Sequence, residues 1–356
     1  MKLLHAADFH LDSPFRALRP EQAQRRREEQ RELLQTLAAL CRKEQCRLVL
    51  LSGDLFDSKE VSRQSLDALK AMAEEMTVPV CIAPGNHDFY CETSPYARES
   101  WPENVHIFTE ETPDSIVFPG LNCRVWGAAF RQMDCPPLEN FHAAGEEIYQ
   151  IMALHGDPLS NGSFSRFVSK AAIAASGLSY LGLGHVHRTG SIKAGRTLCA
   201  WPGCLMGRGF DETGEKGALV VTLEASVSAK FCPLPGRRYE TLSVEAGDNP
   251  MEAILSALPV DTRQDIYRIT LRGAGEAALP ELQVALQDRF FDLTILDETT
   301  APKNLWEAEA QDSLEGLYFR LLHKAMEEAE GDDKRQLRLA ASLGRRFLDG
   351  EEVQLP

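Results

Sequence analysis

The stretch Pro84-Gly85-Asn86-His87-Asp88 is the starting point for interpreting this chain. The residues from 78 to 83 are apolar or small except for Pro79, and a short run of this kind is typical of a buried strand. Pro-Gly directly after the run indicates a tight turn. An amide, an imidazole and a carboxylate therefore follow one another at a predicted strand end, where α/β folds place their ligand sites.

Other predicted strand ends carry side chains of the same kind. They are Asp8-Phe9-His10, then Gly53-Asp54-Leu55-Phe56-Asp57, and finally His155-Gly156 together with Gly184-His185-Val186-His187. Between the first strands, apolar residues recur at helical spacing over residues 19–43 and again from Ser62 onward. This alternation of strand and helix predicts a parallel sheet at the start of the fold.

Beyond residue 104 the pattern changes to mostly strands, with one helix expected near Glu139–Glu147. This order predicts an α/β (α+β) fold in which two packed sheets are flanked by helices. Pro233-Leu234-Pro235-Gly236 marks a domain boundary. We expect a first domain over residues 1–235, a small α/β domain over 236–300 and a helical tail over 301–356. The tail is either a partner-binding arm or a helical hairpin packed on its own domain.

Composition restricts the possible functions. The chain has 356 residues, of which 44% are hydrophobic and 26% are charged, as in ordinary soluble proteins. A net charge of −15 argues against a general basic coat for nucleic acid, but it leaves a local anion site open. The nine cysteines include no CxxC pair, which favours reduced thiols over a disulfide framework. With an early polar start and no apolar run of membrane length, we expect a cytoplasmic protein without membrane contact.

The polar side chains at the strand ends are oxygen and imidazole donors. Asp8 and His10 are two residues apart and would point the same way on an extended chain, and His185 and His187 repeat that spacing. Such mixed donors favour Mn, Fe or Zn without resolving among them. Seven ligands exceed the needs of one tetrahedral ion and suit two ions that share a carboxylate. The seven candidates are Asp8, His10, Asp54, Asn86, His155, His185 and His187.

Two divalent cations would make this site positive, so it would attract a phosphate even in an acidic protein. Ions about 3.5–4 Å apart can activate water and neutralise the charge of a phosphoryl transition state. His87 stays outside the ligand set, and beside a phosphate it would stabilise charge or protonate the leaving oxygen. Each motif is weak alone, but their joint occurrence after successive strands makes coincidence improbable. The remaining histidines have no ligand-like neighbours, and we interpret them as structural: His5, His106, His142 and His323.

The motifs D-x-H, GD-x-x-D, GNHD, HG and GHVH, in this order over roughly residues 1–232, resemble those of the calcineurin-like metallophosphoesterases. The resemblance implies a four-layer αββα sandwich with two metal ions at its strand ends. It implies that Asp54 bridges the ions and that His87 is catalytic. One ion would be held by Asp8, His10, Asp54 and His187, and the other by Asp54, Asn86, His155 and His185.

Within that superfamily, the opening HAADFHLDSPF, the motif GDLFD and the spacing to a module near residue 237 resemble the DNA repair exonuclease branch, the SbcD and YhaO-type nuclease subunits. This implies a Mn²⁺-dependent phosphodiesterase that cleaves DNA together with an SMC-like coiled-coil ATPase. It also implies a DNA-capping second domain and an ATPase-binding tail. We also consider a homodimer.

One position departs from the pattern of that branch. Several of its nucleases have a histidine after GDLF, where this chain has Asp57. We expect Asp57 to orient His87 or a metal ligand, and the predicted catalytic set is His87, Asp57 and Asp88. DNA binding also needs basic side chains near the centre. The candidates close to the motifs in sequence are Arg16, Arg131, Arg166, Arg188 and Arg208, although all five also fit solvated surface arginines.

Two alternatives remain. The same chemistry would serve a phosphatase or a cyclic-nucleotide phosphodiesterase, whose compact pocket would accept small phosphates and leave duplex ends intact. A non-catalytic scaffold that uses the fold only for docking is less consistent with the sequence, because all seven candidate ligands are present.

Overall fold

The computed structural model describes residues 1–131, 138–159, 167–247, 249–273, 277–299 and 306–348. The chain divides into two units. The first comprises Met1–Thr241, Asp261–Arg268 and Asp288–Asp292, and the second comprises Leu242–Val260, Ile269–Gln287 and Leu293–Pro356.

The first six-stranded sheet has the order β12-β11-β1-β2-β3-β4. Its strands are β1 (Lys2–Ala6), β2 (Val49–Leu51), β3 (Val80–Ile82), β4 (Val105–Ile107), β11 (Gly217–Leu223) and β12 (Val227–Pro233). Strands β1 to β4 are parallel, while β11 and β12 extend the sheet antiparallel. Helix α1 (Pro20–Lys43) follows β1, α2 (Arg63–Met76) follows β2, and the short α3 (Pro95–Arg98) follows β3. The predicted parallel opening is therefore confirmed.

The second six-stranded sheet has the order β5-β6-β7-β8-β10-β9. Its strands are β5 (Asp114–Phe118), β6 (Cys123–Gly127), β7 (Tyr149–His155), β8 (Tyr180–Gly184), β9 (Gly190–Ala194) and β10 (Thr197–Trp201). A 3-10 turn, η1 (Pro119–Leu121), joins β5 to β6, and helix α4 (Lys170–Ala175) precedes β8. Strands β6, β7, β8 and β10 are parallel, and β5 and β9 form antiparallel edges.

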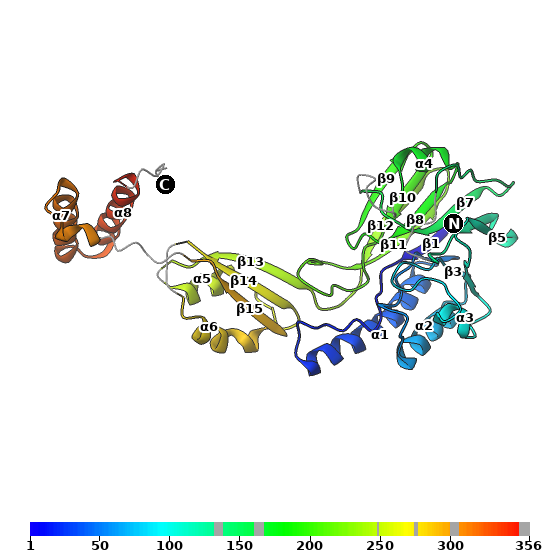
Figure 1. Ribbon diagram of the computed structural model, residues 1–356, viewed down its shortest axis with the longest axis horizontal. Helices are drawn as coiled ribbons and strands as arrows, with labels where there is room; N and C mark the ends of the chain where they lie inside the picture. Colours follow the sequence, from blue (N-terminus) through cyan, green and yellow to red (C-terminus); the bar gives the residue numbers. More distant parts are fainter. Residues whose placement is uncertain (132–137, 160–166, 248, 274–276, 300–305, 349–356) are drawn as a thin grey trace. The chain divides into compact units, whose positions relative to one another are not determined.

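Three buried cores hold four layers together (Figure 1). Leucines of α1 and α2 pack on one face of the first sheet. The other face of that sheet packs on the second sheet, for example through Leu3 and Leu50 against Val125 and Ile151. The outer face of the second sheet packs against Ile173 of α4. This arrangement is the four-layer αββα sandwich that the family resemblance implies.

The prediction of a helix near Glu139–Glu147 is wrong. This segment forms turns and bends, although its glutamates and alanines favour a helix. The backbone φ is 66° at Asn140 and 129° at Gly145, and neither value is compatible with a right-handed helix. An ion pair of 3.0 Å between Arg124 Nε and Glu147 Oε2 fixes the end of the segment against β6.

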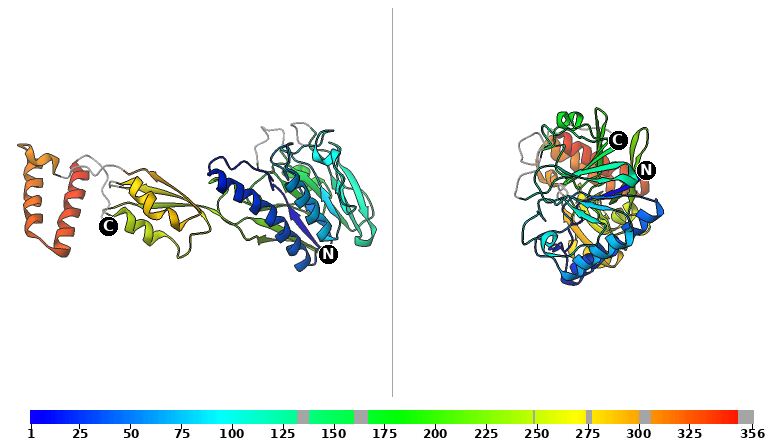
Figure 2. Two further views of the ribbon diagram at one scale, coloured as in Figure 1. Left: turned by 90° about the horizontal axis from the view of Figure 1, so that it is seen from below. Right: turned by 90° about the vertical axis from the view of Figure 1, so that its right-hand side faces the viewer.

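A third sheet, with the order β13-β14-β15, is built from β13 (Tyr239–Glu245), β14 (Ile266–Arg272) and β15 (Asp292–Asp297). Helices α5 (Pro250–Ala257) and α6 (Leu279–Leu286), and the turn η2 (Gln287–Arg289), connect its strands. The short η3 (Glu307–Ala310) precedes α7 (Leu314–Glu328) and α8 (Gly331–Leu348), which lie side by side (Figure 2). Within the described residues, no helix combines the length and apolar character that crossing a membrane requires.

Candidate metal centre

Loops at the carboxyl ends of strands from both large sheets meet in the first unit. Because β1, β2 and β3 are parallel, the residues that follow them lie at one edge, and the Asp8 amide donates to the Gly53 carbonyl over 3.0 Å. Several bonds connect this edge to the second sheet. The His185 amide donates to Asp8 Oδ1 over 3.0 Å, and His155 Nδ1 donates to the Ser52 carbonyl over 2.8 Å.

The backbone at this edge is unusual. The φ angles are 54° at Asp8, 45° at His10, 51° at Asp54 and 86° at His185, all in the left-handed region that non-glycine residues rarely adopt. The expectation that Asp8 and His10 lie on an extended chain is therefore wrong, because β1 ends at Ala6 and the residues beyond it turn sharply. Backbone strain of this kind persists where surrounding structure enforces it, commonly at functional sites.

One group of donors, the His10 cluster, consists of Asp8, His10 and His187. His10 Nε2 lies 3.3 Å from His187 Nε2, and His187 Nε2 lies 3.8 Å from Asp8 Oδ1. Metal–nitrogen bonds of about 2.1 Å place two ligand atoms of one ion about 3–3.4 Å apart. The two facing imidazole nitrogens therefore fit a shared cation.

A second group, the His155 cluster, consists of Asp54, His155 and His185. His155 Nε2 lies 3.2 Å from Asp54 Oδ2 and 3.2 Å from the side-chain oxygen of Asn86. Asp54 Oδ2 is also 3.8 Å from His10 Nε2, so this carboxylate lies between the two clusters. His185 and His187 belong to different clusters. This agrees with the ligand sets that the family resemblance implies, and not with the expectation that both side chains point the same way on an extended chain.

Two glycines allow the close approach of the loops. A Cβ added to Gly85 would lie 2.2 Å from Asp54 Oδ1. Gly53 has a φ of 81°, and a Cβ there would lie 2.6 Å from His155 Nδ1. Larger residues at either position would displace a candidate ligand, so the tight turns predicted at these glycines are required by the geometry.

Burial and mutual charge perturb the ionisation of the clusters. Burial raises the pKa of Asp8 to about 7 and lowers the pKa of His10 to about 4. Burial alone would raise the pKa of Asp54, but the neighbouring His155 and His10 outweigh it and lower that pKa far below its usual range. Burial alone would lower the pKa of His155, but Asp54 outweighs it and raises the value to about 9. Buried carboxylates of this kind need compensating positive charge, which a divalent cation supplies.

His87 is exposed, and with His10 and Asp54 it forms a third group of possible metal donors. Its backbone amide donates to Asp54 Oδ1 over 2.9 Å, and its Nδ1 lies 3.1 Å from the Asp57 carbonyl oxygen. The centroids of the His87 and His10 rings are 4.8 Å apart. An exposed imidazole in this position can reach a group bound over the clusters.

The two other predicted catalytic residues lie behind the candidate ligands. Asp57 Oδ1 is 3.2 Å from His10 Nδ1 and accepts a bond of 3.0 Å from Ser13 Oγ. The Asp57 side chain therefore faces a candidate metal ligand, while only its carbonyl faces His87.

Asp88 is fully buried beneath the site. Its carboxylate accepts the Tyr96 hydroxyl over 2.5 Å and four backbone amides, those of Asp54, Leu55, Phe56 and Gly85. These bonds join the loop after β2 to the loop after β3. The geometry therefore gives Asp88 a positioning role for the neighbouring loops.

Sequence reasoning missed Glu212, which is 4% exposed. Glu212 Oε1 accepts from His187 Nδ1 over 2.7 Å. The Arg208 guanidinium connects Glu212 to Asp57, at 2.7 Å and 3.1 Å respectively. Nothing local to Glu212 distinguishes it among the 53 acidic residues of the chain, so only the folded arrangement identifies it.

The candidate DNA-contacting arginines differ in their surroundings. Arg208 is engaged by Asp57 and Glu212, and Arg131 forms an ion pair of 3.1 Å with Glu110. Arg16 and Arg188 are exposed. Arg166 lies outside the described residues.

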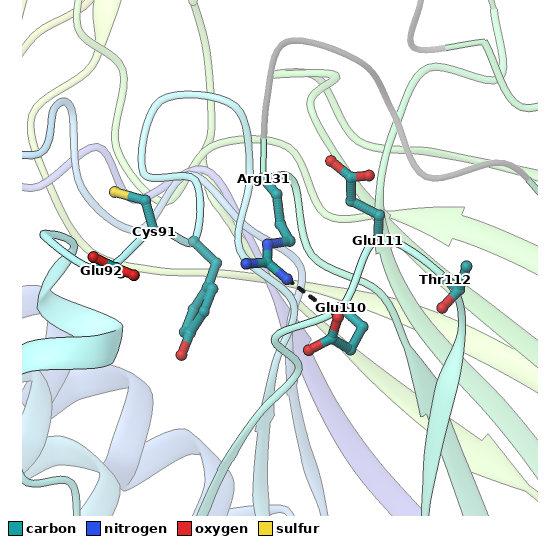
Figure 3. A pocket seen from close by; sticks show the side chains of 7 residues that line it. Cys91, Glu92, Glu110, Glu111, Thr112 and Arg131 are labelled. Carbon is teal, nitrogen blue, oxygen red and sulfur yellow. Dashed lines mark hydrogen bonds and ion pairs between the residues drawn. The ribbon is translucent and has the colours of Figure 1, made fainter.

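An acidic pocket of about 500 Å³ lies beside the site (Figure 3). It borders the loops after β3, β4 and β6, and its lining consists of Tyr90, Cys91, Glu92, Glu110, Glu111, Thr112 and Arg131. The Tyr90 amide donates to the Phe130 carbonyl over 2.7 Å, and the Phe130 ring packs against His155 with centroids 5.6 Å apart. Three carboxylates with one guanidinium make this side unfavourable for a phosphate chain.

The αββα sandwich and the paired donor clusters at its strand ends are the arrangement expected of a metallophosphoesterase. Residues 1–188 match the family model described as calcineurin-like phosphoesterase, and the chain belongs to that family of phosphoester hydrolases.

Three curated relatives extend over more of the chain. The uncharacterized metallophosphoesterase YhaO of Bacillus subtilis is 26% identical over 339 residues, which cover 88% of this chain and 82% of the relative. The SbcD subunit of the nuclease SbcCD of Bacillus subtilis is 24% identical over 257 residues, covering 60% of this chain and 64% of the relative. Its counterpart in Staphylococcus epidermidis is 21% identical, covering 95% and 98%. Among solved structures, a dimetal phosphatase from Danio rerio is 12% identical, with a TM-score of 0.44 over 65% of this chain and 95% of that chain.

Proposed function

We propose that this protein is a phosphodiesterase that uses two divalent cations to cleave DNA. The observation that carries the proposal is the pair of neighbouring donor clusters with Asp54 between them and two imidazole nitrogens facing each other at 3.3 Å. We assign one cation to the His10 cluster and the other to the His155 cluster with Asn86, and Asp54 contributes to both.

Cations at these positions would supply Lewis-acid charge that activates water and offsets the charge of a phosphoryl transition state. Manganese is our proposed metal, although oxygen and imidazole donors also suit Fe and Zn. His87 reaches over the clusters from the exposed side and would protonate the leaving oxygen. We assign Asp57 and Asp88 to positioning, because their carboxylates contact the candidate ligand His10 and the loop backbones, respectively.

DNA is the substrate we favour because two relatives are named as the SbcD component of the nuclease SbcCD. In this proposal residues 236–300 form a DNA-capping domain, and the protein acts in DNA repair in the cytoplasm. Since the net charge is −15, attraction of phosphate would depend on the cations themselves and not on the surface as a whole.

An SMC-like coiled-coil ATPase is the proposed partner, and residues 301–356 are the proposed contact. Helix α7 exposes a row of leucines at helical spacing, with Leu314 at 85%, Leu317 at 47% and Leu321 at 61% exposure. Deletion of residues 304–356 should abolish ATPase binding and spare Mn²⁺-dependent hydrolysis of small phosphodiesters. If the deletion also unfolds the rest of the chain, the tail belongs to the core of the protein.

The test of the enzymatic proposal is hydrolysis by the purified full chain with Mn²⁺. Linear duplex DNA, single-stranded DNA and bis-p-nitrophenyl phosphate should all be cleaved, and EDTA should abolish each reaction. His87→Ala serves as the active-site control. Failure to cleave any of the three, with no difference between the wild type and His87→Ala, would end the proposal.

A phosphatase or cyclic-nucleotide phosphodiesterase is the second candidate, and the acidic pocket beside the clusters favours it. The carboxylates of Glu92, Glu110 and Glu111 would repel a long polyanion more than a single small phosphate. A panel of mononucleotides, cyclic nucleotides and DNA decides between the candidates, because the second predicts turnover of the small substrates alone.

A further inference from the structure

The Nδ1 atoms of two candidate ligands, His155 and His187, have different kinds of partner. In the His155 cluster, His155 is fully buried and its Nδ1 donates to a backbone carbonyl, that of Ser52. In the His10 cluster, the His187 side chain is 30% exposed and its Nδ1 donates to the Glu212 carboxylate over 2.7 Å. His187 is therefore oriented by a carboxylate side chain, whereas His155 Nδ1 is bonded to the backbone.

Glu212 is itself held on both oxygens. Its Oε1 accepts from His187 Nδ1 and from Arg208 Nη2, each at 2.7 Å. Its Oε2 accepts from the Arg208 backbone amide over 2.8 Å and from Arg208 Nε over 3.3 Å. With both oxygens engaged and 4% exposure, the carboxylate cannot turn away without breaking several bonds at once.

We propose that Glu212 is a positioning residue for the cation of the His10 cluster alone. It accepts the Nδ1 proton of His187, which fixes the tautomer and leaves the Nε2 lone pair directed toward His10 Nε2 at 3.3 Å. Arg208 keeps Glu212 in that place. The inference rests on the proposed two-cation site and adds that the orientation of His187 depends on the carboxylate behind it. Removal of such a partner typically costs about 10–100-fold in metal affinity.

Two substitutions of Glu212 distinguish the effect of its position from the effect of its charge. Glu212→Asp keeps the charge but is shorter by one methylene, so it no longer reaches His187. Glu212→Gln keeps the length, but its NH2 group would face N–H donors in either amide orientation, since both Glu212 oxygens are acceptors. Asp211→Asn is the matched control, because it removes one negative charge from the exposed neighbouring residue.

The experiment is titration of the metal-free full chain with Mn²⁺, followed by electron paramagnetic resonance. The amplitude of the signal from unbound Mn²⁺ gives the number of binding sites and the affinity of each. Exchange coupling in the spectrum of the bound ions shows that two ions lie side by side. The wild type and Asp211→Asn should bind two ions with coupling. Glu212→Asp and Glu212→Gln should bind one ion as the wild type does and the second about 10-fold or more weakly, with the coupled signal lost at two equivalents.

Wild-type affinities in both Glu212 variants would overturn the inference and leave the two-cation site intact. Equal weakening of both sites, or the same loss in Asp211→Asn, would also overturn it, because the effect would then not be specific to His187. If one Glu212 variant fails to fold, the other carries the test, and if neither folds, Glu212 is a general structural residue and the inference is wrong. A wild-type chain that binds no Mn²⁺ would contradict the proposed function itself.

Discussion

His5 is a buried imidazole that should make the protein sensitive to mild acid. It lies on β1 with no exposed surface, its Nδ1 is 2.8 Å from the Tyr180 hydroxyl on the opposite sheet, and its Nε2 is 3.0 Å from Ser52 Oγ. Ser52 Oγ donates to the Gly182 carbonyl over 2.9 Å, so it accepts from His5 Nε2, and Nδ1 accepts from Tyr180. A neutral imidazole satisfies both bonds, and protonation would add a buried charge.

Burial lowers the pKa of His5 from 6.5 to about 3. In the unfolded chain His5 binds a proton near pH 6.5, so the unfolded state gains protons first as the pH falls. The stability contributed by neutral His5 is therefore complete above pH 6.5 and is lost progressively between pH 6.5 and about pH 3. By linkage, lowering the pH from 7.5 to 5 should cost about 2 kcal/mol, and acidification below both pKa values about 5 kcal/mol.

The assay is urea unfolding of the metal-free wild type and of His5→Gln at pH 7.5, 6 and 5. Glutamine is neutral throughout this range, and groups that titrate equally in both proteins cancel in the difference. We expect the variant to be less stable at pH 7.5, and we expect the advantage of the wild type to shrink by about 2 kcal/mol on going to pH 5. A difference between the two proteins that does not change with pH would refute the reasoning.

The remaining predictions concern the site and its loops. His87→Ala should lower DNA cleavage about 10²–10⁴-fold, with a smaller effect on bis-p-nitrophenyl phosphate, whose leaving group needs no proton. Equal losses on the two substrates would contradict the role of His87 as a general acid. Gly85→Ala would place a Cβ 2.2 Å from Asp54 Oδ1, so it should reduce bound Mn²⁺ measured by mass spectrometry, and full metal occupancy would contradict this. Asp88→Asn should lower the free energy of unfolding, measured with urea, by about 3 kcal/mol. The reason is that the NH2 group of an amide cannot accept hydrogen bonds, whereas both Asp88 oxygens accept from backbone amides and one also accepts from Tyr96. A loss below about 1 kcal/mol would argue against this account.

Much of the fold is predictable from the sequence because buried parallel strands are continuous apolar runs. Leu48-Val49-Leu50-Leu51 is such a run, and its last three residues form β2 in the middle of the first sheet. Helix α2 begins after Ser62, whose hydroxyl accepts the Ser65 amide, so its start is also visible locally. The helix expected near Glu139–Glu147 shows the limit, because its composition favours a helix while the left-handed residues Asn140 and Gly145 do not allow one.

The site is predictable in part. The sequence identifies the polar residues that follow strands, and the structure brings the candidate donors together, while their role as ligands stays a prediction. The left-handed backbone at Asp8 and His10 is not visible in a D-x-H motif, because it arises from packing between loops. Glu212 and Ser52 contact His187 and His155 from distant segments, and no local pattern indicates such contacts.

The most direct test of the two-cation account is an anomalous difference map from crystals of the full chain grown with Mn²⁺. The account predicts two manganese peaks, one in the His10 cluster and one in the His155 cluster, with the Asp54 carboxylate between them. A single peak, or manganese bound away from Asp54, would contradict it.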